Sequence, residues 1–270
     1  MSKRAVCVGI NDYPGVESDL GGCVNDARAW ATTLIELCGF SSGDVRLILN
    51  GEATQRNILS AIDELVGGGR AGDVLAFIYS GHGTWVPDAG VKDEVDGRDE
   101  ALVPCEADFD RLILDDDLRS RLGRMGPGAS FTFIADSCYS GTVTRLLPGR
   151  ARGGKVRFYP PPFDLAREVG ASSPLKKRIS DISEERMAEI VMSAARDDEP
   201  SAEDSFEGVA RGVFSYFAIK TLRESGPAIT YEEWLARIRS SISAAGFPQS
   251  PQLEGPSHLK RRQVFSPLSA

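Results

Sequence analysis

The chain has 270 residues, 41% hydrophobic and 26% charged, a composition typical of a globular protein with one sizeable core. Its 39 acidic and 31 basic residues give a net charge of −8, which argues against a nucleic-acid partner. No apolar run approaches the roughly 18 residues of a membrane span, and the first apolar stretch is too short for a signal peptide. The five cysteines are scattered and contain no C-x-x-C pair, so neither a disulfide framework nor a zinc site is expected. We therefore expect a cytoplasmic protein.

Short apolar runs alternate with amphipathic segments along most of the chain. In chain order the pattern predicts a strand over 5–10, a helix over 24–37, a strand over 45–49, a helix over 54–65, a strand over 74–79, a helix over 115–124, strands over 130–135 and 189–193, and helices over 212–222 and 230–244. Thr230 and Glu233 have the spacing of a capping box. Such alternation favours an α/β fold with a mostly parallel central sheet and helices on both faces.

The pattern breaks between residues 147 and 173, where proline, glycine and basic residues follow one another without periodicity. This composition indicates an exposed loop or linker. From residue 246 onward, proline and serine predict an irregular tail.

Two of the predicted strands end in motifs that carry chemistry. Strand 74–79 is followed by Ser80-Gly81-His82-Gly83, and strand 130–135 by Asp136-Ser137-Cys138-Tyr139-Ser140-Gly141. In a parallel sheet both motifs lie at the carboxyl edge, where open α/β folds bind their ligands. There the Cys138 thiolate can attack a carbonyl, and His82 can hold the thiolate and protonate the leaving amine. The backbone N–H groups of Gly83 and Cys138 can bind the developing oxyanion.

The alternative interpretation is a structural core thiol at Cys138 and a satisfied loop histidine at His82. The matching strand-then-turn settings favour catalysis, because a caspase-like histidine lies about fifty residues upstream of its cysteine. The second histidine, His258, falls in the predicted irregular tail, and no other cysteine has a comparable setting.

The two motifs resemble the His and Cys boxes of metacaspases and their bacterial relatives, the orthocaspases, in peptidase family C14. Residues 8–13, 22–27 and 99–104 agree as well, so that the resemblance covers 3–146 closely and 191–222 more loosely. It implies a caspase-haemoglobinase-like three-layer sandwich. Residues 1–146 would form a large-subunit region with His82 and Cys138, 147–187 a linker, and 188–270 a small-subunit-like region that completes the same fold. It also implies a cysteine endopeptidase, and a role in bacterial cell death or defence would fit the family.

Metacaspases cleave after arginine or lysine through an acidic primary pocket, whose family positions fall on Cys23, Asp26, Ser80 and Asp136. A carboxylate pair in a partly desolvated cleft favours a guanidinium and repels an aspartate. The resemblance therefore implies protein or peptide substrates with Arg or Lys at the cleavage site. The alternative is that Asp26 is a solvated helix residue and Asp136 a turn residue.

Many relatives cleave their own chain between the two subunit regions. This makes the basic residues of the predicted linker candidate self-cleavage sites: Arg150, Arg152, Lys155 and Arg157. The alternative is a solvated basic loop without a role in processing.

Twelve carboxylates and three basic residues occupy residues 88–117, and hard oxygen ligands at this density suit calcium. The calcium ligands of the family fall on Asp99, Asp115 and Asp116. A further family ligand falls on Arg145, whose charge opposes metal binding. A solvated loop followed by an Asp-rich helix N-terminus would explain the same carboxylates. The peptidase chemistry itself requires no cofactor.

Two other classes of function compete with this reading. A catalytically idle caspase-like scaffold would act through protein binding, but both catalytic residues are present. A flavodoxin-like small-molecule domain would need a glycine-rich phosphate loop after the first strand, which this sequence lacks. Because no regulatory domain is evident, we expect a partner protein, a ligand or self-processing to control activity.

Overall fold

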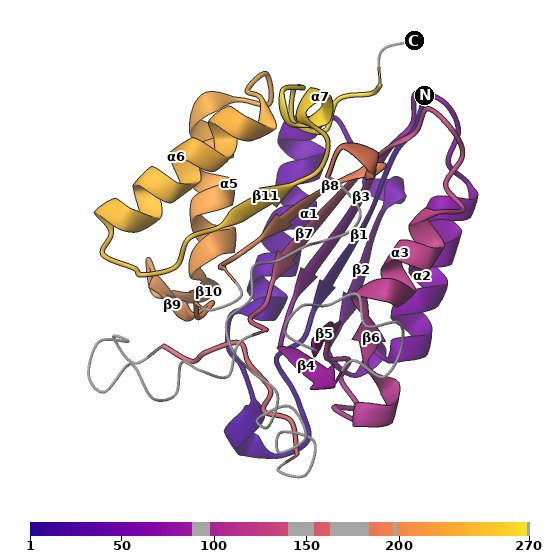
Figure 1. The fold of residues 1–270 in the computed structure, drawn as a ribbon. Helices are drawn as coiled ribbons and strands as arrows, with labels where there is room; N and C mark the ends of the chain where they lie inside the picture. Colours follow the sequence, from indigo (N-terminus) through magenta and orange to yellow (C-terminus); the bar gives the residue numbers. More distant parts are fainter. Residues whose placement is uncertain (88–97, 140–153, 163–183, 197–198, 269–270) are drawn as a thin grey trace.

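A six-stranded sheet forms the centre of the molecule (Figure 1). The structure is a computed structural model and describes residues 1–87, 98–139, 154–162, 184–196 and 199–268. The strand order is β11-β8-β7-β3-β1-β2, in which only β11 runs antiparallel to its neighbour. The strands are β1 (Lys3–Gly9), β2 (Val45–Leu49), β3 (Val74–Ser80), β7 (Ser130–Asp136), β8 (Glu189–Ser193) and β11 (Gln252–Glu254).

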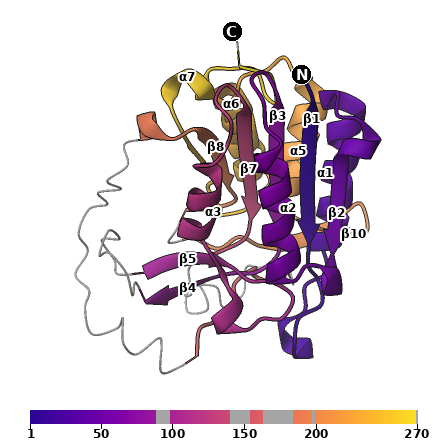
Figure 2. The same cartoon turned by 90° about the vertical axis from the view of Figure 1, so that its right-hand side faces the viewer.

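Helices cover both faces of this sheet (Figure 2). On one face lie α1 (Cys23–Cys38), α5 (Val213–Ser225) and α6 (Tyr231–Ala244), and on the other α2 (Gln55–Gly67) and α3 (Asp115–Leu122). All residues of β3 are buried, as expected for a strand with helices on both sides. The predicted three-layer α/β fold with a mostly parallel sheet is confirmed.

The ends of the helices follow local capping chemistry. The Thr54 side chain accepts a hydrogen bond from the Asn57 backbone N–H at the start of α2. Thr230 and Glu233 form the predicted capping box of α6. The remaining short helices are α7 (Ser257–Lys260), η1 (Val16–Ser18), η2 (Ser42–Asp44), η3 (Asn50–Glu52), η4 (Phe109–Arg111) and η6 (Glu184–Arg186). Among the described helices, none has the length and apolar character needed to cross a bilayer.

Two small sheets lie at the carboxyl edge of the central sheet, in the lower part of Figure 1. One consists of β4 (Gly83–Pro87), β5 (Arg98–Leu102) and β6 (Ile113–Leu114), and the other of β9 (Glu203–Phe206) and β10 (Val209–Gly212). The sequence pattern predicts none of these strands. The prediction of an irregular tail after residue 246 is also wrong, because β11 pairs with β8 at the sheet edge and α7 follows it. An edge strand of three half-buried residues is too short to show an alternation of apolar and polar residues in the sequence.

Candidate active site

The pairing of β3 with β7 brings the two predicted catalytic residues to one edge of the sheet. Ser80 is the register partner of Asp136, and His82 and Cys138 each lie two residues beyond this pair. Both side chains are buried, with His82 3% and Cys138 2% exposed. The loops that carry them touch, because a Cβ on Gly83 would lie 2.5 Å from the Cys138 carbonyl oxygen. Only glycine allows this approach.

His82 is held by one contact of its ring and one of its backbone. Its Nε2 lies 2.7 Å from the Ser18 carbonyl oxygen, and its backbone N–H donates to the Tyr13 hydroxyl at 2.9 Å. Because a carbonyl only accepts, this contact places the proton of a neutral ring on Nε2 and leaves the lone pair on Nδ1. Burial lowers the pKa of His82 from 6.5 to about 4. Nδ1 is buried and has no hydrogen-bond partner among the described residues, so the ring is a neutral base at pH 7.

The Cys138 thiol donates to the backbone carbonyl of Glu199, at 3.4 Å. Glu199 is itself held by Ser250, whose backbone N–H and hydroxyl donate to its carboxylate at 2.6 and 3.0 Å. The Cys138 sulfur must therefore release this contact before it attacks a carbonyl carbon.

The two predicted oxyanion donors converge on a single oxygen atom. The backbone N–H groups of Gly83 and Cys138 donate to the carbonyl oxygen of Arg157, at 3.0 and 3.1 Å respectively. These distances are those of donors that stabilise a developing oxyanion.

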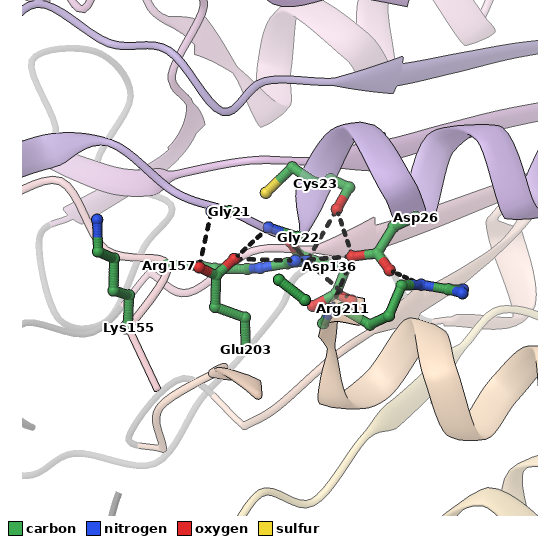
Figure 3. Close-up of polar contacts among 12 residues, drawn as sticks. Gly21, Gly22, Cys23, Asp26, Asp136, Lys155, Arg157, Glu203 and Arg211 are labelled. Carbon is green, nitrogen blue, oxygen red and sulfur yellow. Dashed lines mark hydrogen bonds and ion pairs between the residues drawn. The ribbon is translucent and has the colours of Figure 1, made fainter. Parts of the chain in front are cut away.

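The side chain of Arg157 has no exposed surface and lies among the predicted pocket residues. Figure 3 shows its contacts with Asp26, Asp136 and Glu203. The guanidinium lies 2.7 Å from an Asp26 oxygen and 2.9 Å from an Asp136 oxygen, and it donates to the Ser80 hydroxyl at 2.8 Å. The fourth pocket position, Cys23, has a fully buried thiol beside Ser80, and burial raises its pKa. The structure thus brings all four predicted pocket residues together around one guanidinium.

A third carboxylate at the pocket was not predicted from the sequence. Glu203 on β9 accepts from the backbone N–H groups of Gly21 and Gly22 at 2.8 and 2.9 Å, and its other contact is Arg157 at 3.7 Å. It belongs to no motif, and only the fold brings it to the start of α1 (Figure 3).

Two residues of β10 complete the pocket and were also missed. Arg211 lies 2.7 Å from the second Asp26 oxygen, so it remains a counter-charge when the pocket is empty. The Gly212 N–H donates to Asp26 at 2.8 Å. A Cβ on Gly212 would come within 2.2 Å of an Asp136 oxygen and 2.5 Å of the Arg157 guanidinium, so a side chain here would close the pocket.

The segment that carries Arg157, residues 154–162, is called the strap below. It pairs with the β9 region like an added strand: Arg157 N–H donates to the Ser201 carbonyl and Glu203 N–H to the Lys155 carbonyl, both at 3.0 Å. Backbone pairing combined with one side chain in a pocket is how extended peptides are commonly recognised.

The four candidate self-cleavage residues differ in position. Arg157 occupies the pocket, whereas the side chain of Lys155 is exposed. Arg150 and Arg152 lie outside the described residues.

The predicted calcium ligands do not form a metal-binding group. Asp115 and Asp116 both pair with Arg119, at 3.0 and 2.9 Å. Within the described ranges, no group of three or more His, Cys, Asp or Glu side chains is placed to hold a metal ion, and this includes Asp99. Arg145 lies outside these ranges. In the described part of the chain Arg119 thus neutralises two of the three predicted ligands, and the four carboxylates of residues 88–97 lie outside it.

Residues 3–147 match the family model of the metacaspase, peptidase C14 domain. The chain belongs to the metacaspases. It is 42% identical to Metacaspase-4 of Arabidopsis thaliana over 146 residues, which cover 52% of this chain and 34% of that protein. It is 34% identical to Metacaspase-3 of the same plant over 253 residues, which cover 90% and 66%. The match to Metacaspase-1 of Cryptococcus neoformans is 32% over 301 residues, covering 97% and 64%.

This metacaspase therefore spans between a third and two thirds of the length of these curated relatives. The fold is also that of protein GSU0716 from Geobacter sulfurreducens, with a TM-score of 0.71 over all of both chains at 21% identity. The predicted resemblance to metacaspases is confirmed by the family model.

Proposed function

We propose that this metacaspase is a cysteine endopeptidase that cleaves protein or peptide chains after arginine or lysine. The observation that carries the proposal is the pose of Arg157. Its side chain fills the acidic pocket while its own carbonyl oxygen accepts from Gly83 and Cys138. A residue bound in this way brings its carbonyl group to the backbone of Cys138, as the residue before a scissile bond must.

In the proposed reaction, neutral His82 takes the thiol proton on Nδ1 and the Cys138 sulfur attacks the substrate carbonyl carbon. The N–H groups of Gly83 and Cys138 hold the resulting oxyanion. His82 then gives its proton to the leaving amine as the C–N bond breaks, which leaves a thioester on Cys138. Water, deprotonated by His82, hydrolyses this thioester and restores the thiol.

Charge gives the pocket its selectivity. Three carboxylates face the side chain of the residue before the scissile bond, those of Asp26, Asp136 and Glu203. Arg211 offsets only one of these three negative charges. A buried cation regains its lost hydration through such partners, whereas an aspartate would be repelled by them.

We further propose that self-cleavage occurs between Arg157 and Phe158, since Arg157 is the candidate bound at the oxyanion donors. The cut would separate the proposed large-subunit region, residues 1–146, from the small-subunit-like region, residues 188–270. Intact mass should show a fragment that ends at residue 157 in the parent protein. Arg157→Gln should abolish that fragment and Lys155→Gln should not.

The main test uses fluorogenic peptides that end in Arg, Lys or Asp, with calcium and with a chelator. We expect turnover of the Arg and Lys peptides, and a loss of at least about 10³-fold in Cys138→Ala. The matched control is Cys105→Ala, because the Cys105 thiol lies away from the site and contacts the Gly51 carbonyl.

Turnover of the Asp peptide alone would contradict the pocket, and a fully active Cys138→Ala would contradict the mechanism. If the parent protein cleaved none of the peptides under either condition, an idle caspase-like scaffold would be the better explanation. The comparison of calcium with chelator separates a metal requirement from the chemistry of Cys138.

A further inference from the structure

The residues after the proposed scissile bond also occupy defined positions. Tyr159, two residues beyond Arg157, lies among three rings that come from outside the strap. Its ring centroid is 5.7 Å from that of His82, 6.1 Å from that of Phe109 and 6.3 Å from that of Tyr13. The Tyr159 side chain is half-buried and packs against the core on the α2 and α3 side of the sheet.

The backbone of Gly83 fixes the position of Tyr159 relative to the scissile bond. Gly83 N–H donates to the Arg157 carbonyl at 3.0 Å, and the Gly83 carbonyl accepts from Tyr159 N–H at 2.9 Å. Between these two bonds, Phe158 forms a parallel bridge with Gly83. A peptide whose carbonyl enters the oxyanion donors is therefore held in one register, with its second following residue against the three rings.

The rings that surround Tyr159 are held by the body of the protein and not by the strap. Tyr13 follows β1 and is buried, with its hydroxyl bonded to the His82 N–H and 3.3 Å from the Val103 carbonyl. Phe109 lies in η4, and its ring packs against the same core. An incoming peptide that displaces the strap would meet the same surface.

Resting on the proposed function, we propose that Tyr13, His82 and Phe109 form a subsite that selects an aromatic side chain two residues after the scissile bond. Tilted ring contacts at these separations add specific attraction to the burial of apolar area. An aromatic side chain at this position also covers the ring of His82, and burial keeps this ring neutral. The preferred substrate class is thus a basic residue followed, two positions on, by an aromatic residue.

The test adds internally quenched peptides to the full chain. The parent peptide copies residues 154–162 with Lys155→Gln, so that arginine is its only basic residue, and its tyrosine is replaced in turn by Phe, Leu, Ala or Asp. We expect kcat/KM for Tyr and Phe to exceed that for Ala by about tenfold, with Asp the poorest. A peptide with Asp in place of the arginine controls for the primary pocket.

A change in the enzyme should remove this preference. In Phe109→Ala we expect the Tyr-to-Ala ratio of kcat/KM to fall from about tenfold to about threefold. The ratio does not depend on the fraction of folded enzyme, and Phe109→Leu provides a milder second variant. The matched control is Phe247→Ala, another partly buried aromatic, which packs against the opposite core and should keep the full ratio.

The possible outcomes separate the two proposals. Equal cleavage of the Tyr and Ala peptides after arginine would overturn the aromatic subsite and leave the peptidase in place. An unchanged ratio in both Phe109 variants would overturn the assignment of the subsite to these rings. Failure to cleave any arginine peptide would overturn the proposed function, and the subsite with it.

Discussion

The charged side chains at the site are buried to an unusual degree for ions. Arg157 and Asp26 have no exposed side-chain surface, and Asp136 is 1% exposed. Burying ions costs several kcal/mol each unless their partners are well placed, and here each ion has partners from distant parts of the chain. Such a set of charges tolerates the loss of Arg157 only if another cation or water takes its place. On the proposed function, the cation that takes its place is the arginine or lysine side chain of a substrate.

A titration tests the buried state of His82. Burial lowers its pKa from 6.5 to about 4, so between these values the unfolded chain binds a proton that the folded chain does not. Stability must therefore fall as the pH drops across this window, by about 3 kcal/mol at pH 4 relative to pH 7. The His82→Gln protein lacks this titrating group, so its free energy of unfolding should fall by about 3 kcal/mol less over the same change of pH. Urea unfolding at both pH values measures it.

Both proteins in this comparison should carry Cys138→Ala, so that the chain stays intact. Carboxylates that titrate in the same window are common to both and cancel in the difference. Equal losses of stability in the two proteins would show that His82 is not held neutral by burial.

At the scale of elements, the strap is anchored mainly by Arg157. Replacing Arg157 by Gln in the Cys138→Ala background removes the guanidinium and leaves three buried carboxylates facing each other, which disfavours the bound strap by about 3–5 kcal/mol. We expect the amides of Gly83, Tyr159 and the alanine at position 138 to lose hydrogen-exchange protection by at least about tenfold, because one partner of each of these hydrogen bonds lies in the strap.

The control for this measurement is Lys155→Gln, which removes an exposed charge and its contact with the Asp19 carbonyl at 2.5 Å but leaves the pocket filled. Hydrogen exchange followed by mass spectrometry should show a much smaller loss of protection than in the Arg157→Gln protein. Equal protection in the Arg157→Gln protein would mean that backbone pairing alone holds the strap.

Elements that pack on the central sheet could be read from the sequence. The predicted strands 45–49 and 189–193 coincide with β2 and β8, whose apolar and β-branched residues form short runs in the sequence. The predicted helix 24–37 matches α1 within one residue at each end. The strands at the carboxyl edge are not predicted because they are short and carry no continuous apolar run; β9, for example, has four residues, of which only Glu203 is buried. Backbone hydrogen bonds around the site stabilise these strands, and such bonds produce no periodic pattern of apolar residues in the sequence.

The site divides in the same way. His82, Cys138 and Asp136 stand in motifs at strand ends, and Asp26 stands in a segment that resembles the family, so the sequence could propose them. Glu203 carries no such signal, because its role depends on a hairpin folding back onto α1. The aromatic surface around Tyr159 likewise joins three separate segments.

At the scale of the whole molecule, the two sides of the proposed cut share one sheet and one core. β8 lies between β7 and β11, so a strand from after the cut pairs with a strand from before it. On the face covered by α1, Trp30 packs edge-on against Trp234 with centroids 6.1 Å apart and donates to the Ser215 hydroxyl at 3.1 Å. Interfaces of this kind resemble a domain core cut in half and persist without a covalent link.

We therefore expect cleavage after Arg157 to leave the two fragments associated. Size-exclusion chromatography of the processed protein in native buffer should give one peak at the elution volume of uncleaved Cys138→Ala. Intact mass should find both fragments, 1–157 and 158–270, in that peak. They should separate only in denaturant, because parting them exposes the apolar core beneath α1 and α6 to water. Separate elution in native buffer would mean that the strap, and not the shared core, holds the two halves together.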